Sequence, residues 1–266
     1  MMLEKKSKVL LLIVVYNKLI ENIPAPRTFL LDSDDVATSL EREVIIWDNS
    51  TEDEYRKENK NHALNAGYRY LTNNRNCSLS YVYNFVIATH DFDYIVISDD
   101  DSNYCKNYLS SLEKVINEKQ LVAIPQVFSN GKLYSPAKLG VVVGKHLKHI
   151  SPGINYGLIG ITSGVIINKI VFEDCRIKFD EQLDFYGIDT DFFLNLKKEK
   201  IPVYVLNETI EHDLSMESEN LTFEEKINGF RYKNNKSAMI YINKKRTLFH
   251  YLMCRLYYFL YETIKG

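Results

Sequence analysis

The sequence predicts an α/β domain in which a mostly parallel sheet is flanked by helices. Three apolar, β-favouring segments, residues 9–15, 43–47 and 94–98, are each followed at once by polar residues. Continuous apolar runs of this length are typical of strands that are buried on both faces of a parallel sheet. Because ligands bind at the carboxyl ends of such strands, the polar residues that follow them are the first candidates for a functional site.

The composition is that of an ordinary globular chain with a sizeable core. The 266 residues are 45% hydrophobic and 26% charged, with a formal net charge of −2. A chain without a basic excess does not suggest a nucleic-acid partner. The 4 cysteines are scattered without a CxxC pair, so the default is reduced thiols in the cytoplasm, without a disulfide framework or zinc site. The apolar run at residues 9–15 is too short to span a bilayer and is interpreted as the first strand.

The other elements are predicted from periodicity and from turn-forming residues. Pro24 and Pro26 predict irregular chain after residue 20. Helices are predicted, where apolar residues recur at helical spacing, at residues 34–40, 79–89, 108–118 and 192–196. Further strands are predicted at residues 68–71, 121–125, 138–143 and 203–206, and a strand or the start of a helix at 165–168. From residue 216 the chain becomes polar and helical, which predicts a domain of residues 1–215 and a helical extension of residues 216–266.

Three consecutive carboxylates, Asp99, Asp100 and Asp101, follow the strand at 94–98. Side chains alternate along an extended chain, so Asp99 and Asp101 point one way and Asp100 the other. A hard cation would relieve the repulsion between these charges, because Mg²⁺ and Mn²⁺ prefer oxygen ligands and often share them with a nucleotide. The alternative is an acidic turn in which Asp101 or Ser102 caps the next helix.

Seven short segments in a fixed order carry a resemblance to a known family. They are VVYN (14–17), WDNS (47–50), NNRNCSLSYVYN (73–84), SDDDS (98–102), ITSG (161–164), YGIDTDFFL (186–194) and EHDLS (211–215). Over roughly residues 9–235 the chain resembles the inverting glycosyl transferase family 2, most of all the bacterial rhamnosyltransferase-type enzymes of surface polysaccharide synthesis.

The resemblance implies a GT-A fold, with a Rossmann-like sheet and a helical C-terminal tail. It also implies a metal-dependent, inverting glycosyltransferase that uses Mn²⁺ or Mg²⁺. The donor would be a nucleotide-diphosphate sugar, dTDP-rhamnose or a UDP-hexose, and the acceptor a glycan of the bacterial cell surface. The alternative is a catalytically inactive nucleotide-sugar-binding or scaffold member of a polysaccharide assembly complex. The intact set of Asp99, Asp101, Asp189 and His212 favours the enzyme.

The resemblance further implies a role for each matching residue. Asp189 would be the catalytic base, and Asp99, Asp101 and His212 the metal ligands. The implied substrate-binding residues are Tyr16 and Asp48 at the nucleobase, with Asn76, Asn84, Asp99, Asp100, Ser163, Gly164 and Asp191. The residue types leave other interpretations open: Asp189 also suits a helix N-cap, Asp48 a turn, and His212 a surface or core histidine. Asp191 is expected to begin the helix that follows the base.

The C-terminal segment combines cations with an apolar, aromatic helix. Lys244, Lys245 and Arg246 precede a run to residue 264 whose Leu and Phe recur at helical spacing. Its apolar length falls short of a membrane span. Either this helix packs on the domain or on a second subunit of a homodimer, or it lies in a membrane interface. The second alternative would suit a cytoplasmic enzyme peripheral to the inner face of the cell membrane, with a lipid-linked glycan as acceptor.

Overall fold

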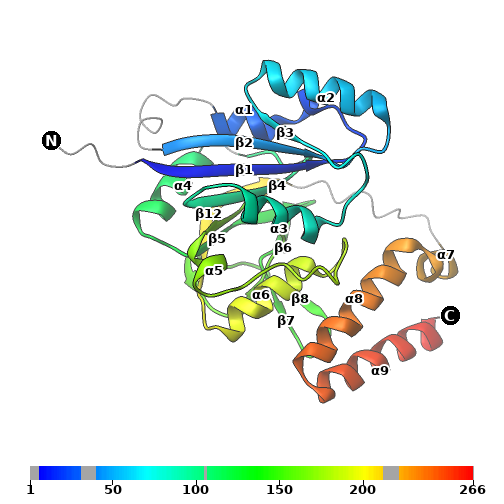
Figure 1. Ribbon diagram of the computed structural model, residues 1–266. Helices are drawn as coiled ribbons and strands as arrows, with labels where there is room; N and C mark the ends of the chain where they lie inside the picture. Colours follow the sequence, from blue (N-terminus) through cyan, green and yellow to red (C-terminus); the bar gives the residue numbers. More distant parts are fainter. Residues whose placement is uncertain (1–5, 31–39, 105–106, 212–221, 266) are drawn as a thin grey trace.

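The computed structural model describes residues 6–30, 40–104, 107–211 and 222–265 (Figure 1). Within these residues a nine-stranded sheet has the strand order β3-β2-β1-β4-β11-β5-β12-β9, and β6 pairs with β5. A second sheet of three strands has the order β10-β7-β8. The predicted α/β class, with a mostly parallel central sheet flanked by helices, is confirmed.

Four parallel strands form the half of the sheet that the sequence predicts best. They are β1 (Ser7–Val15), β2 (Leu40–Asp48), β3 (Arg69–Leu71) and β4 (Tyr94–Asp99). In the β1 pairings, Val15 lies opposite Asp48 and Val14 opposite Asp99. The carboxyl ends of β1, β2 and β4 therefore meet at one edge of the sheet, as the polar residues after them predict.

Strand β11 (Val165–Asn168) runs antiparallel to both β4 and β5. Its antiparallel course brings the turn at residues 161–164 beside the end of β4. The other strands are β5 (Val122–Ser129), β6 (Lys132–Ser135), β7 (Ala137–Leu139), β8 (Gly144–His146), β9 (Gly153–Asn155), β10 (Leu158–Ile159) and β12 (Val203–Glu211). The strand predicted at 138–143 is wrong in extent, because Gly140 N–H bonds to the Val143 carbonyl (2.9 Å) in a turn between β7 and β8.

Helices pack on both faces of the sheet. Leu10 and Leu12 of β1 share a core with residues of α3 and α6, whereas Leu11 and Ile13 share another with α4. The helices are η1 (Ile20–Asn22), α1 (Pro24–Leu30), α2 (Asp53–Asn65), α3 (Leu79–Thr89), α4 (Tyr108–Asn117), α5 (Ile170–Glu173) and α6 (Ile188–Lys198).

Two helix predictions need correction. Helix α1 contains Pro24 and Pro26, which we expected to keep the chain irregular. Both prolines lie in the first turn, where a missing N–H costs no hydrogen bond. Helix α6 begins at Ile188 rather than at residue 192, so Asp191 does not begin it. The helix predicted at 34–40 lies outside the described residues, except for Leu40, which opens β2.

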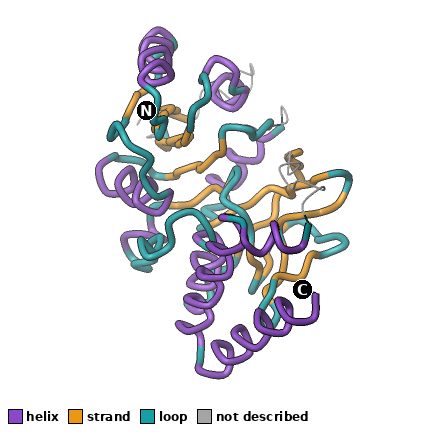
Figure 2. Tube along the Cα trace, turned by 90° about the vertical axis from the view of Figure 1, so that its right-hand side faces the viewer, coloured by secondary structure: helices purple, strands orange, loops and turns teal. Residues whose placement is uncertain are grey.

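The C-terminal helices α7 (Phe223–Asn228), α8 (Phe230–Arg246) and α9 (Leu248–Lys265) confirm the predicted helical tail. Figure 2 shows α8 and α9 as neighbours at one end of the molecule. They form a helical hairpin, which we call the C-terminal hairpin, broken by the extended backbone of Thr247. Its inner side chains belong to the same core as α6, among them Met239, Ile242 and Cys254. None of the helices in the described segments has the length and apolarity to traverse a membrane.

Candidate active site

The ends of β1, β2 and β4 surround a cleft of about 540 Å³, which we call the triplet cleft. Its aromatic walls include Tyr16 and Phe230, both at least half exposed, as is usual for side chains that stack on a base or sugar. The lining residues are Val14, Tyr16, Asn49, Asn76, Leu79, Asp99, Asp100, Asp101, Phe185, Tyr186 and Phe230.

The three aspartates have different surroundings. Asp99 accepts a hydrogen bond from the Ser163 hydroxyl. Asp100 accepts from Lys18 Nζ (3.2 Å) and from the Tyr16 N–H, and Lys18 also donates to the Asp100 carbonyl (2.8 Å). Burial raises the pKa of Asp100 and the Lys18 ammonium opposes that shift. Asp100 thus ties β4 to the segment after β1, while Asp101 is exposed at the mouth of the cleft.

Asp189 lies in the first turn of α6 but does not cap this helix, whose N-cap is Gly187. Its carboxylate accepts hydrogen bonds from both the hydroxyl and the backbone N–H of Thr162. The Asp189 side chain is only partly exposed to solvent, and the buried Tyr83 lies near it. Burial, and secondly the charge of Asp99, raise the pKa of Asp189 to about 7.

Asp189 also opens onto a second cleft of about 360 Å³, which we call the hairpin cleft. One wall comes from the region of the small sheet, with Tyr134 and His146 in ring contact at 4.8 Å. The opposite wall comes from the C-terminal hairpin. Its residues there are Asn235, Met239 and Tyr258. Asp189 therefore stands between two clefts, one that holds the aspartate triplet and one walled by the hairpin.

The turn at residues 162–164 connects Asp189 with Asp99 of the aspartate triplet. Thr162 bonds Asp189, and the next residue, Ser163, bonds Asp99. Gly164 anchors the turn, since its N–H donates to the Ile97 carbonyl (2.8 Å) and its own carbonyl accepts from Tyr108 (2.8 Å). The turn therefore fixes the distance between the base candidate and the triplet.

Replacing Gly164 with Ala should destabilise the protein strongly. The backbone has φ +74°, and a Cβ would come within 2.8 Å of Ile210 Cδ1 and 3.0 Å of the Tyr104 ring. Left-handed backbone and overpacking together predict a loss of about 2–4 kcal/mol in the free energy of unfolding, measured by urea denaturation. The matched control is Gly131→Ala, which has φ +71° but open space around the added methyl. Equal losses in the two variants would contradict the packing argument.

The structure brings most of the predicted site residues to these clefts. Tyr16, Asn76, Asp99, Asp100 and Asp101 line the triplet cleft, and Asp189 the hairpin cleft. The turn that carries Ser163 and Gly164 lies between the two clefts. His212 lies outside the described residues.

Two predicted substrate-binding residues are engaged elsewhere. Asp48 is fully buried and accepts from Ser50 N–H (2.9 Å), Asn59 (2.9 Å) and Tyr70 (3.0 Å), so its neighbour Asn49 reaches the triplet cleft instead. Asn84 donates to the Phe179 carbonyl (2.8 Å) and fixes the loop after α5. In this arrangement both residues position backbone segments and do not line the cleft.

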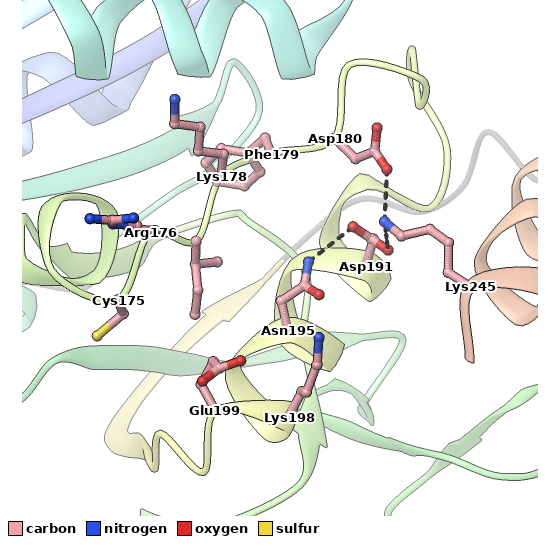
Figure 3. Close-up of a pocket in the computed structure, with 11 residues that line it drawn as sticks. Cys175, Arg176, Lys178, Phe179, Asp180, Asp191, Asn195, Lys198, Glu199 and Lys245 are labelled. Atoms are coloured by element: carbon pink, nitrogen blue, oxygen red, sulfur yellow. Dashed lines mark hydrogen bonds and ion pairs between the residues drawn. The ribbon is translucent and has the colours of Figure 1, made fainter. Parts of the chain in front are cut away.

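Asp191 lines neither of the two clefts, and Figure 3 shows its carboxylate between Lys245 and Asn195. Its buried carboxylate binds Lys245 Nζ (2.7 Å) and Asn195 Nδ2 (3.1 Å), and Lys245 also binds Asp180 (2.7 Å). These residues line a separate pocket of about 350 Å³. Asp191 therefore joins α6 to the C-terminal hairpin.

Asp99 and Asp101 are suitable for a hard cation, because both present carboxylate oxygens at the cleft. Mg²⁺ keeps water and phosphate ligands and needs only one or two carboxylates from a protein. In the described part of the chain, no three His, Cys, Asp or Glu side chains gather into a complete metal cage. The donor set thus fits a cation that shares its coordination sphere with a phosphate-bearing ligand.

Sequence reasoning found Asp189 but missed Lys18 and the walls of the hairpin cleft formed by the small sheet and the C-terminal hairpin. Lys18 follows the VVYN segment directly. Its positive charge at the end of the first strand, next to the strand that leads into the three aspartates, was a signal in the sequence that could have identified it. The hairpin cleft combines residues about a hundred positions apart, and no local pattern marks them.

Comparison with known proteins identifies the family. The sequence profile described as Glycosyl transferase family 2 matches residues 11–161, more than half of the chain. No curated protein sequence matches at a significant level.

The fold is shared with solved structures of low sequence identity. S. aureus TarS in complex with UDP-GlcNAc has 15% identity and a TM-score of 0.54, with 89% of this chain and 65% of that chain covered. In another TarS structure the chain spans 44% of the longer protein, at 14% identity, a TM-score of 0.53 and 91% coverage of this chain. GalNAc-T7 with UDP, GalNAc and Mn²⁺ has 12% identity and a TM-score of 0.61, with 88% and 48% covered. With this GT-A-like fold and the family profile spanning β1 to the turn before Thr162, the chain belongs to glycosyl transferase family 2.

Proposed function

We propose that this chain transfers a sugar from a nucleotide-diphosphate donor in the triplet cleft to an acceptor hydroxyl in the hairpin cleft, with inversion. The observation that carries the proposal is the place of Asp189 between the two clefts. It is bonded to Thr162 while Ser163 bonds Asp99, and its pKa is raised to about 7. A general base is most effective when its pKa lies near the working pH.

The chain's own residues support a single displacement. The acceptor oxygen forms a bond to the anomeric carbon as the bond from that carbon to the diphosphate oxygen breaks, and Asp189 takes the hydroxyl proton. The two Thr162 hydrogen bonds hold the carboxylate in a fixed orientation. A single displacement needs no covalent intermediate, so one carboxylate on the acceptor side is sufficient.

The triplet cleft suits the donor. Tyr16 and Phe230 offer exposed aromatic faces for the base or sugar. Asp99 and Asp101 would hold Mn²⁺ or Mg²⁺, which when bound offsets the charge of the departing diphosphate. The bound groups of the similar structures, UDP-GlcNAc in TarS and UDP with Mn²⁺ in GalNAc-T7, support this choice of donor class and cation.

The finer assignment is a hexosyl or rhamnosyl transfer in bacterial cell-surface polysaccharide synthesis, with dTDP-rhamnose or a UDP-hexose as donor. It is supported by the family and by the hairpin cleft, whose aromatic side chains suit a glycan acceptor. A nucleotide-sugar-binding scaffold without transfer activity is the second candidate. It would use the triplet cleft but would have no need of a carboxylate with a raised pKa at the hairpin cleft.

The two candidates are separated by a panel of nucleotide sugars. We expect one donor to be hydrolysed slowly in the presence of Mn²⁺, and faster when a matching glycan is added, with release of the nucleoside diphosphate as the readout. The Asp189→Asn variant should bind the same donor without turning it over. A wild-type protein that binds a donor but releases no diphosphate with any acceptor would favour the scaffold.

A further inference from the structure

The outer face of α9 is apolar along its whole length. Among the described side chains of this helix, seven large apolar ones are between 42% and 76% exposed. At 100° per residue they fall on one side of the helix, with Thr263 as the polar residue among them. We call these residues the α9 stripe: Leu248, Phe249, Leu252, Leu256, Phe259, Leu260 and Ile264.

The α9 stripe cannot be turned inward, because the opposite face of the helix is already packed. Cys254 and Tyr258 are buried in the main core. Tyr261 stacks on Tyr232 of α8 (5.9 Å between ring centroids), and Glu262 accepts from Lys236 Nζ (2.6 Å). An apolar surface of this size held outward on a folded domain is typical of an interaction site.

The charge around the stripe is strongly positive. Residues 230–265 contain eight Lys and Arg and one Glu, so the C-terminal hairpin contributes +7 and the rest of the chain −9 to the net charge of −2. Lys244 and Arg255 are exposed beside the stripe. The turn between β7 and β8 adjoins the hairpin, since Arg246 donates to the Val141 carbonyl (2.9 Å). That turn lies in residues 119–172, which contain no Asp or Glu.

We propose that the α9 stripe docks in the interface of an anionic membrane, with α9 parallel to the surface. Apolar side chains on one face and flanking cations are the features of an interfacial helix. A symmetric pair of copies that met through this face would bring together two hairpins that each keep a positive net charge even though Lys245 is paired with Asp180 and Asp191, whereas anionic headgroups attract the hairpin. The helix is about 27 Å long, which is ample for a contact in the membrane plane.

Docking in this way would hold the hairpin cleft on the far side of α9, about 10–12 Å from the membrane contact. Tyr258 lines that cleft from the buried face of α9, while Leu252 and Leu256 lie on the stripe of the same helix. An acceptor attached to the membrane would then reach the cleft by extending past α9. This consequence rests on the proposed function, but the docking itself does not, because vesicle binding is measured without donor or acceptor.

The test is sedimentation of the full chain with phosphatidylcholine vesicles, with and without phosphatidylglycerol. We expect binding to the anionic vesicles at low salt, and at least about tenfold weaker partitioning to neutral vesicles or at high salt. The double variant Leu252→Glu, Leu256→Glu should lower the partition coefficient by at least about tenfold, because it puts charge into the apolar contact. The matched control is Leu64→Glu on α2, where the leucine is 62% exposed but lies far from α9 (Figure 1).

Several results would overturn the proposal. The first is that the wild type does not pellet with anionic vesicles at low salt, and the second is that the double variant pellets as well as the wild type. The third is that analytical ultracentrifugation without lipid shows the wild type as a dimer and the double variant as a monomer. Circular dichroism melting verifies that each variant folds. If the double variant does not fold, the exposed pair Lys244→Glu, Arg255→Glu serves instead, and unchanged binding to anionic vesicles by that variant would equally reject the proposal.

Discussion

Replacing Asp189 with Asn should remove most of the sugar transfer and leave donor affinity close to that of the wild type. The amide has the shape of the carboxyl group and can still accept from Thr162, but it cannot take a proton. Loss of a general base typically lowers the rate ~10²–10⁴-fold. The proposed function puts the donor in the triplet cleft, which Asp189 does not line, so calorimetric titration with the donor should give a nearly unchanged affinity.

The same variant should become more stable relative to the wild type as the pH rises. The pKa of Asp189 is about 7 in the folded state, against the ordinary 3.8, because of burial and the nearby charge of Asp99. Between these two values the folded protein holds a proton that the unfolded chain releases, so wild-type stability falls as pH rises. The melting temperature of Asp189→Asn minus that of the wild type should therefore increase from pH 5 to pH 7 and change little above pH 7. Wild-type kcat should rise through a midpoint near pH 7.

The matched control for both measurements is Asp184→Asn, which changes an exposed aspartate five residues before Asp189. It should have wild-type turnover and the same melting temperature as the wild type at either pH. Near wild-type transfer by Asp189→Asn would show that Asp189 serves the structure alone. A difference in melting temperature that decreases as the pH rises would show that the fold favours the ionised carboxylate, contrary to the raised pKa.

The predictable part of the fold is the part with local signals. Strands β1, β2 and β4 are central and parallel, so their sequences are continuous apolar runs with an abrupt polar end. The ends of these strands define the edge of the sheet, which is why the aspartate triplet and the residues after β1 were found in the sequence. Helix α1 was missed because a proline forbids the interior of a helix but not its first turn.

The direction of a polar side chain was less predictable than its position along the chain. Asp48 and Asn49 are neighbours at the end of β2, but only Asn49 reaches the triplet cleft. Both side chains are buried, and Asn49 is itself bonded to Trp47 and Cys77, so the residue types at this strand end do not tell which of the two borders the cleft. Asp191 is two residues after Asp189 on a helix, where such residues face different ways, and it binds Lys245 instead.

The hairpin cleft was beyond sequence reasoning for a different reason. Its walls come from the region of β6 to β8 and from α8 and α9, brought together by packing of Met239 and Ile242 against the domain. The apolar spacing of α9 predicted a helix, but periodicity does not tell which of two apolar faces is covered. The buried face carries Cys254 and Tyr258, and the exposed one carries the α9 stripe.

Replacing Asp101 with Asn should abolish most of the effect of Mn²⁺ on donor affinity. Asp101 lines the triplet cleft and is exposed at its mouth, where a cation and a phosphate-bearing donor can reach it. Removing even an indirect partner of a metal site typically costs 10–100-fold in affinity, so losing a direct carboxylate should cost at least roughly that much. Calorimetric titration of donor with and without Mn²⁺ measures the difference.

Asp100→Asn is the control from within the same triplet. Strand β4 ends at Asp99, and Asp100 and Asp101 lie in the turn after it, so all three line the cleft rather than alternating as expected for an extended chain. The Asp100 carboxylate differs in accepting from Lys18 and from the Tyr16 N–H, so it supports the segment after β1. We expect this variant to lose stability, and to lose donor affinity to the same extent with and without Mn²⁺. If Asp100→Asn removed the Mn²⁺ effect and Asp101→Asn kept it, the bond to Lys18 would not keep the Asp100 carboxylate from the cation. The assignment of Asp101 would then be wrong.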